Sequence, residues 1–150
     1  MPSTSRAMMA RNALRMLNEP HGGVLVNTMV AGAEKDAAIK ACAVTVELDE
    51  RQLCDVELLM QGGFSPLTGF MDEADYVGVV SEDMKTANGV IFGLPIVFDT
   101  DDERIQPGRK ILLEYKGTPI ATFDVSSRYT PDKPLEAKNC YGTSSLEHPG

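Results

Sequence analysis

The chain has 150 residues and a net charge of −8, from 14 basic and 22 acidic residues. This length suits one domain with its own core, and 43% hydrophobic with 24% charged residues is an ordinary globular composition. The acidic balance argues against a general nucleic-acid binder, and no apolar run is long enough to cross a bilayer.

The three cysteines, Cys42, Cys54 and Cys140, are widely spaced and form no C-x-x-C pair. An odd number at this spacing argues against a disulfide scaffold and a zinc knuckle, and it favours a reducing compartment. We interpret Cys54 as a half-buried structural thiol. A redox-active role for Cys54 is the alternative.

Residues 1–18 differ in composition from the rest, because they hold Arg6, Arg11 and Arg15 and no acidic residue. An Arg-rich, Ser-containing, acid-free start is typical of an organellar transit peptide. A partly helical tail without a targeting role is the alternative. We therefore expect an intracellular protein, in the cytoplasm or in a plastid or mitochondrion if the extension is a transit peptide.

The chain from residue 20 opens with a turn, because Pro20 is followed by His21 and two glycines. A short strand is predicted to begin at 24–26, a helical turn at 33–40, and an alternating strand at 43–48. His21 has no second ligand at metal spacing, so we expect it to hydrogen-bond locally within the turn.

The densest local signals lie in residues 48–71. Asp49 and Gln52 have the spacing of a helix-capping box, and Leu48 and Leu53 that of a hydrophobic staple. Gly62 can supply the left-handed residue that ends such a helix. The predicted helix carries one apolar stripe, formed by Leu53, Val56, Leu59 and Met60.

A turn over residues 64–70, with a phenylalanine at each end, leads to a second predicted helix. Asp72 is its N-cap, with Asp75 three residues later, and Met71 and Tyr76 are placed as a staple. Acidic residues here suit the positive end of the helix dipole, which we prefer to a divalent-cation site. The apolar face of this helix continues through Val77 and Val80.

The second half of the chain has the period of strands. Residues 90–98 are predicted as an edge or bulged strand, because Pro95 cannot donate to a ladder. Residues 99–103 form an acidic loop without the glycine and glutamate of an EF-hand. Residues 109–115 and 118–125 form a hairpin, and 135–138 a helical turn. The fold class is α+β: a small, mostly antiparallel β-barrel with two consecutive inserted helices.

No catalytic, cofactor-binding or metal-binding residue can be assigned from this pattern. P-loop, G-x-G-x-x-G and G-x-S-x-G motifs are absent, and His21 and His148 are too isolated for a histidine-pair site. Gly62 and Gly63 follow a helix C-terminus, whereas anions prefer an N-terminus.

Residues 51–58 (RQLCDVEL) followed by 62–70 (GGFSPLTGF) resemble the N-terminal domain of ATP sulfurylase, also called sulfate adenylyltransferase. Shorter segments are similar to that family as well. They are Pro20 to Gly23, Tyr76 with Val79 and Val80, Leu94 to Ile96, Glu136 with Ala137, and Glu147 to Pro149. The resemblance covers residues 20–150, and it implies a PUA-like barrel.

The family makes adenosine 5′-phosphosulfate and pyrophosphate from ATP and sulfate, with Mg²⁺, in sulfate assimilation. Its chemistry resides in a following nucleotidyltransferase domain with Q-x-R-N-x-x-H-x-x-H and G-R-D-H motifs. Neither motif occurs here, and Arg11 with Asn12 is not followed by the histidines. The resemblance therefore implies a chain truncated before the catalytic domain, inactive alone and without a bound cofactor. Mg-ATP is expected for the full-length enzyme.

The expected partners are the catalytic domain of the same protein and further copies in a homo-oligomer, with no nucleic acid and no membrane. The alternative is a stand-alone PUA-like binding or regulatory module for a protein or RNA. The sequence is compatible with a catalytic, an adenylylsulfate kinase or a pyrophosphatase domain after Gly150.

Overall fold

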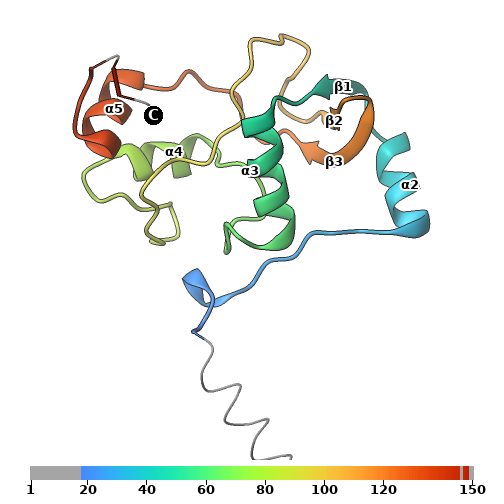
Figure 1. Ribbon diagram of the computed structural model, residues 1–150, viewed down its shortest axis with the longest axis horizontal. Helices are drawn as coiled ribbons and strands as arrows, with labels where there is room; N and C mark the ends of the chain where they lie inside the picture. Colours follow the sequence, from blue (N-terminus) through green and yellow to red (C-terminus); the bar gives the residue numbers. More distant parts are fainter. Residues whose placement is uncertain (1–17, 146, 149–150) are drawn as a thin grey trace, which may run out of the picture.

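The computed structural model describes residues 18–145 and 147–148 (Figure 1). Helices and strands do not alternate strictly along the chain, because two helices and two strands follow each other directly, as expected for an α+β domain. In order they are the 3-10 turn η1 (His21–Gly23), α2 (Gly32–Lys40), β1 (Val44–Glu47), α3 (Glu50–Gln61), α4 (Glu73–Val80), β2 (Lys110–Tyr115), β3 (Thr118–Asp124) and α5 (Lys133–Tyr141).

The described residues form one three-stranded sheet in the order β1-β2-β3. β1 and β2 are parallel, and the connection between them contains α3 and α4, so the two inserted helices are present. β2 and β3 pair antiparallel through the predicted two-residue turn, where Lys116 and Gly117 both have positive φ. The mixed α+β content is confirmed. The closed, mostly antiparallel barrel is not, because this sheet is open and one of its two pairings is parallel.

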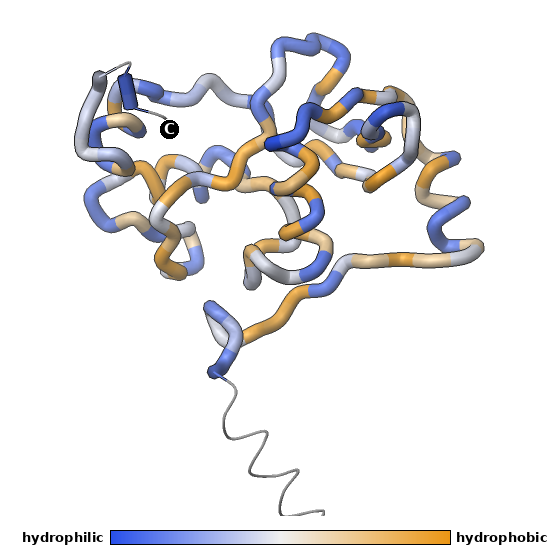
Figure 2. Tube along the Cα trace, in the orientation of Figure 1, coloured by the Kyte–Doolittle hydropathy of each residue, from blue (hydrophilic) through white to orange (hydrophobic). Residues whose placement is uncertain are grey.

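The main core lies between α3 and one face of the sheet. Alternate residues of a strand share a face, so Ile111 and Leu113 of β2 both point at α3 and are almost fully buried. Three members of the apolar stripe predicted on α3, Leu53, Val56 and Met60, face the same core. Figure 2 shows apolar residues on α3 and the strands, and also along the segment after η1 and the loop after α4. The buried members are Val44, Leu48, Val56, Ile105, Ile111, Leu113 and Val125.

A second cluster joins α3 to α4 and the loops around them. Its buried members are Leu59, Leu67, Met71 and Val79. Phe70 packs against both clusters, and its ring lies 5.4 Å from those of Phe98 and Phe123. Both phenylalanines of the 64–70 turn therefore pack on the core, Phe64 on the second cluster and Phe70 between the two clusters.

Helix α5 is longer than the helical turn predicted at 135–138, because Asp132 caps it and a proline occupies its first turn. It packs on α4 through specific polar contacts. The hydroxyl of Tyr76 donates to Glu136 Oε2 over 2.9 Å, and Asn139 Nδ2 donates to the carbonyl of Val80 over 2.8 Å.

The strand predicted at residues 24–26 is wrong. The segment is extended, but it lies outside the sheet. Val26 N–H donates to Ser65 Oγ (2.9 Å) and Thr28 N–H to the carbonyl of Met60 (3.0 Å). A turn and a helix end, rather than a neighbouring strand, supply the partners.

The strand predicted at residues 90–98 is also wrong. Only one isolated bridge forms there, between Lys85 and Ile91. Pro95 has no N–H to donate, and the nearby Ile96 carbonyl accepts from Met71 N–H in a loop contact. These bonds hold the segment against the second cluster without building a ladder.

Cys54 is exposed, so its predicted half-burial is wrong. The α3 stripe turns its neighbour Leu53 toward the sheet and leaves Cys54 on the outer side. The predicted helix at 33–40 and strand at 43–48 are confirmed as α2 and β1. The prediction of a transit peptide falls on residues outside the described range, apart from Asn18. In the described part, no helix is long and apolar enough to cross a membrane.

Candidate functional site

The N-terminus of α3 is closed by its own side chains. Asp49 Oδ1 accepts from Gln52 N–H (2.7 Å), and Gln52 Oε1 accepts from Asp49 N–H (3.1 Å), so the predicted capping box is confirmed. Gln52 also donates to the carbonyl of Asp99 over 3.0 Å. The Gln52 N–H at this helix end is therefore satisfied by the cap, and the Gln52 side chain ties the end to the acidic loop.

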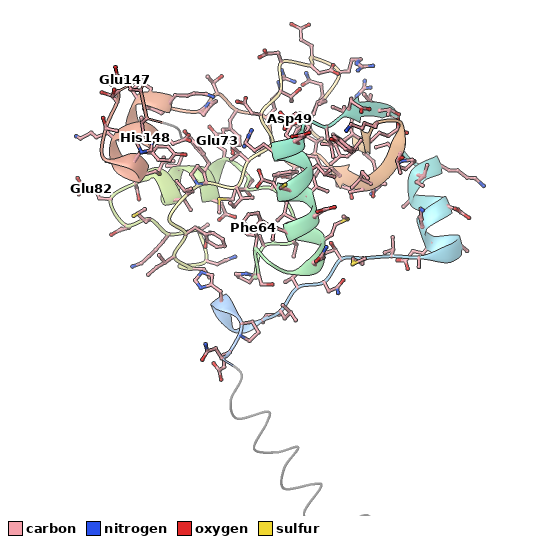
Figure 3. The ribbon with its side chains drawn as sticks, viewed as in Figure 1. Asp49, Phe64, Glu73, Glu82, Glu147 and His148 are labelled. Carbon is pink, nitrogen blue, oxygen red and sulfur yellow. The ribbon has the colours of Figure 1, made fainter. Side chains whose placement is uncertain are left out.

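The C-terminus of α3 is a tightly packed turn. Gly62 ends the helix in the left-handed region, with φ 91°, as predicted. Ser65 is buried, and its Oγ donates to the Gly62 carbonyl (2.7 Å) while accepting from Val26 N–H. In Figure 3, Asp49 lies at the start of α3 and Phe64 lies in the turn after its end. The turn therefore binds the segment that follows η1 and has a structural role.

The predicted local hydrogen bond of His21 is wrong. His21 Nε2 donates to the carbonyl of Ile91, 70 residues away, over 2.7 Å. Its ring also meets that of Phe92 edge-on, at 5.3 Å between centroids. Gly22 sits against Pro66, where an added Cβ would lie 2.7 Å from the ring. The opening P-H-G-G motif therefore joins two loops that are distant in sequence.

The acidic residues at the start of α4 cap the helix, as predicted. Asp72 Oδ1 accepts from Asp75 N–H over 2.9 Å, and Asp75 Oδ1 accepts from Ala87 N–H over 2.8 Å. Within the part of the chain that the structure describes, no group of three or more metal-ligating side chains could hold an ion. The carboxylates of Asp72 and Asp75 accept hydrogen bonds from backbone N–H groups.

The acidic loop at 99–105 is held by two arginines. Arg104 binds the Asp102 carboxylate through Nε and Nη2 at 2.6–3.0 Å, which lowers the pKa of that carboxyl to about 2. Arg128 Nη1 donates to the carbonyls of Asp102 and Ile105 at 2.7 and 2.8 Å. Both guanidinium groups form hydrogen bonds within the loop, so they are not directed toward an external anion.

Three surface cavities are candidates for a ligand site. The first, of about 440 Å³, lies between α3, β3 and Asp72, and no basic side chain lines it. The second, of about 460 Å³, lies between α2 and β3, and Lys35 is its single basic residue. The third, of about 680 Å³, contains Arg51 and Lys133 among aspartates. None gathers the several cations that transfer of a phosphoryl group requires.

The remaining candidate side chains do not converge either. Cys42 Sγ donates to the carbonyl of Ala38 at 3.3 Å, and partial burial raises the pKa of the Cys42 and Cys140 thiols. The ring of His148 lies 5.0 Å from that of Tyr141 at the end of α5, tilted by 46°, and His148 lies far from η1 in Figure 3. The sequence analysis assigns no catalytic, cofactor-binding or metal-binding residue, and the geometry of the described residues adds none.

The model of the PUA-like domain family matches residues 18–150. Sulfate adenylyltransferases from Chaetomium globosum and Coccidioides immitis are 43% and 42% identical to the chain over 144 residues. Each alignment covers 89% of this chain and 25% of the relative. A solved structure, the hexameric APS kinase from Thiobacillus denitrificans, has a TM-score of 0.65 and 33% identity. That match covers 77% of this chain and 24% of the other.

The chain thus spans about a quarter of the length of the curated relatives it matches. The similarity extends over nearly all of its own residues, including every element of the described fold. The chain therefore belongs to the PUA-like domain family, in the form found in the N-terminal quarter of sulfate adenylyltransferases.

Proposed function

We propose that this chain is the N-terminal structural and assembly domain of a sulfate adenylyltransferase and is not catalytic alone. The observation that carries the proposal is the pairing of high identity with low coverage, 42–43% over 89% of this chain but only 25% of the relatives. The reaction joins ATP and sulfate to give adenosine 5′-phosphosulfate and pyrophosphate. On this proposal it belongs to the longer protein.

The chemistry of the described residues supports an indirect role. Formation of a phosphosulfate at the α-phosphate of ATP develops negative charge that must be met by converging cations. The cations named above are used within the domain, Arg104 and Arg128 in one loop and Lys133 in an ion pair with Asp99. Mg-ATP and sulfate are proposed as ligands of the full-length enzyme.

We extend the proposal to architecture, assembly and location. A PUA-like barrel is proposed around the open sheet, supported by the extended segment ending at Phe98, whose ring lies 6.2 Å from that of Phe123 on β3. A homo-oligomer is proposed because the similar structure from Thiobacillus denitrificans is a hexamer. The intracellular location rests on the cysteine pattern and on residues 1–18.

Domain replacement tests the proposal. In the sulfate adenylyltransferase of Chaetomium globosum, the matching quarter is exchanged for this chain, and pyrophosphate release from ATP and sulfate is measured. We expect the chimera to retain activity, whereas the same enzyme with the quarter deleted is the control for loss. A chimera that folds, by circular dichroism, yet is as inactive as the deletion would contradict the proposal.

A further inference from the structure

Charge is distributed very unevenly along this chain. Although 24% of its residues are charged, residues 20–33, 58–71 and 86–98 contain no Asp, Glu, Lys or Arg. These segments include η1 with the extended stretch after it, the C-terminal end of α3 with its turn, and the loop after α4. In Figure 1, η1, the stretch after it and the C-terminal end of α3 lie along the lower side of the molecule, and the loop after α4 begins there. We call their exposed surface the uncharged face.

Direct contacts join the three segments. An added Cβ on Gly22 would lie 2.7 Å from Pro66, and Thr28 N–H donates to the carbonyl of Met60 over 3.0 Å, which joins the first segment to the second. His21 Nε2 donates over 2.7 Å to a backbone carbonyl of the third. The uncharged face is therefore one continuous structure.

Large apolar side chains gather on this face. Leu25 and Met29 are 64% and 62% exposed, and five further large apolar residues of the three segments are exposed as well. In the described part of the chain, only Val77 and Leu135 among the large exposed apolar residues lie outside the three segments. Grouped exposure of this kind marks an interaction surface. The members are Val24, Leu25, Met29, Val30, Leu58, Ile91 and Leu94.

We propose that the uncharged face is the docking surface for the part of a sulfate adenylyltransferase that lies outside this domain. The inference rests on the proposed function and names the surface through which that function operates. The relatives are about four times as long as the matched region, so the same polypeptide supplies a tethered partner. A tethered partner has a high effective concentration and needs no charge to steer it.

Charge argues against the other occupants. The three segments contain no lysine or arginine to neutralise phosphates, which argues against a nucleic-acid backbone as the occupant. Two copies of a chain with net charge −8 repel each other, and no opposite charges on this face offset that repulsion. Apolar surface of a neighbouring domain remains the complementary occupant.

The test uses the Chaetomium globosum chimera and the 150-residue chain in parallel. Leu25→Glu with Met29→Glu places two charges on the face, and Val77→Glu, at a position 57% exposed on α4, is the matched control. If Leu25→Glu or Met29→Glu lowers the Tm of the isolated chain, Val30→Glu is used in place of that substitution. Thermal unfolding of each chimera is followed by calorimetry, together with pyrophosphate release.

We expect the parent chimera and the Val77→Glu chimera to unfold in one transition. The doubly substituted chimera should unfold in two, the first at the Tm of the isolated chain. A single unchanged transition in an active, doubly substituted chimera would overturn the docking surface and leave the proposed function standing. Dimers of the isolated chain that the two substitutions dissociate, seen by sedimentation, would overturn it in favour of a second copy. An inactive parent chimera would contradict the proposed function itself.

Discussion

Tyr76 and Tyr129 show how single residues hold α5 to the rest of the domain. Their rings lie 5.2 Å apart, and Tyr129 donates to the carbonyl of Met71 while Tyr76 donates to Glu136. Burial, and then the neighbouring carboxylates, disfavour the phenolates. The pKa of Tyr129 is raised to about 12, and that of Tyr76 is raised further by its bond to Glu136.

These shifts predict a loss of stability in alkaline solution. A raised tyrosine pKa favours the folded state below about pH 10, the ordinary value, and the contribution is lost as pH rises through about 12. Phenolate absorbance should therefore show Tyr76 and Tyr129 titrating late, together with loss of α5. Tyr129→Phe should remove one late step. Titration of Tyr76 and Tyr129 near pH 10 in the folded protein would contradict this account.

Gly62 gives a second prediction at this scale. Gly62→Ala adds a Cβ 2.5 Å from the Val26 carbonyl, at a residue with φ 91°. Gly89→Ala is the matched control, because it has φ 82° and open space around it. Both substitutions incur about 1–2 kcal/mol of backbone strain. Gly62→Ala should lower the unfolding free energy by at least about 1 kcal/mol more, since residues 25–26 must move. Equal losses in denaturant unfolding would show that this contact is unimportant.

At the scale of elements, α3 depends on its capping box. Asp49→Ala removes the acceptor for Gln52 N–H and should lower the unfolding free energy by about 0.5–2 kcal/mol. Glu57→Ala, which removes an exposed acid from the same helix without touching a cap, should change it by less than about 0.5 kcal/mol. Urea unfolding of both variants measures the difference. A loss for Glu57→Ala as large as for Asp49→Ala would indicate a general charge effect.

Elements fixed by neighbours in sequence could be predicted, and those fixed by distant partners could not. The caps at Asp49 and Asp72 and the stop at Gly62 follow from residues within one helical turn, and all three are present. Residues 24–26 and 90–98 have strand composition, but a strand needs a partner edge, and their bonds go to turns and helix ends. Gly78, which weakens α4 by composition, is required because the backbone of Lys85 passes against it.

The uncharged face had a signal in the sequence, the three charge-free segments. Its assembly could not be foreseen, because it depends on contacts such as His21 with Ile91 across 70 residues. The absence of assigned catalytic residues rested on missing motifs. The engagement of Arg104 and Arg128 in one loop became visible only in the structure.

At the scale of the whole molecule, charge predicts how the domain treats nucleic acids. With a net charge of −8, and with Arg51 and Lys133 held in ion pairs with aspartates, the chain should not bind structured RNA at physiological salt. Fluorescence anisotropy with a labelled hairpin checks this expectation. A submicromolar complex that weakens steeply with added salt would favour the stand-alone binding module.

The central claim is that this domain belongs to a sulfate adenylyltransferase and has no catalytic activity alone. Its most direct test is pyrophosphate release by the purified 150-residue chain, with ATP, Mg²⁺ and either sulfate or molybdate. The Chaetomium globosum enzyme is the positive control. We predict release no faster than from ATP in buffer, because the described cavities hold at most two basic side chains. Sulfate- or molybdate-dependent release above that background would place catalytic machinery within this chain and contradict the account.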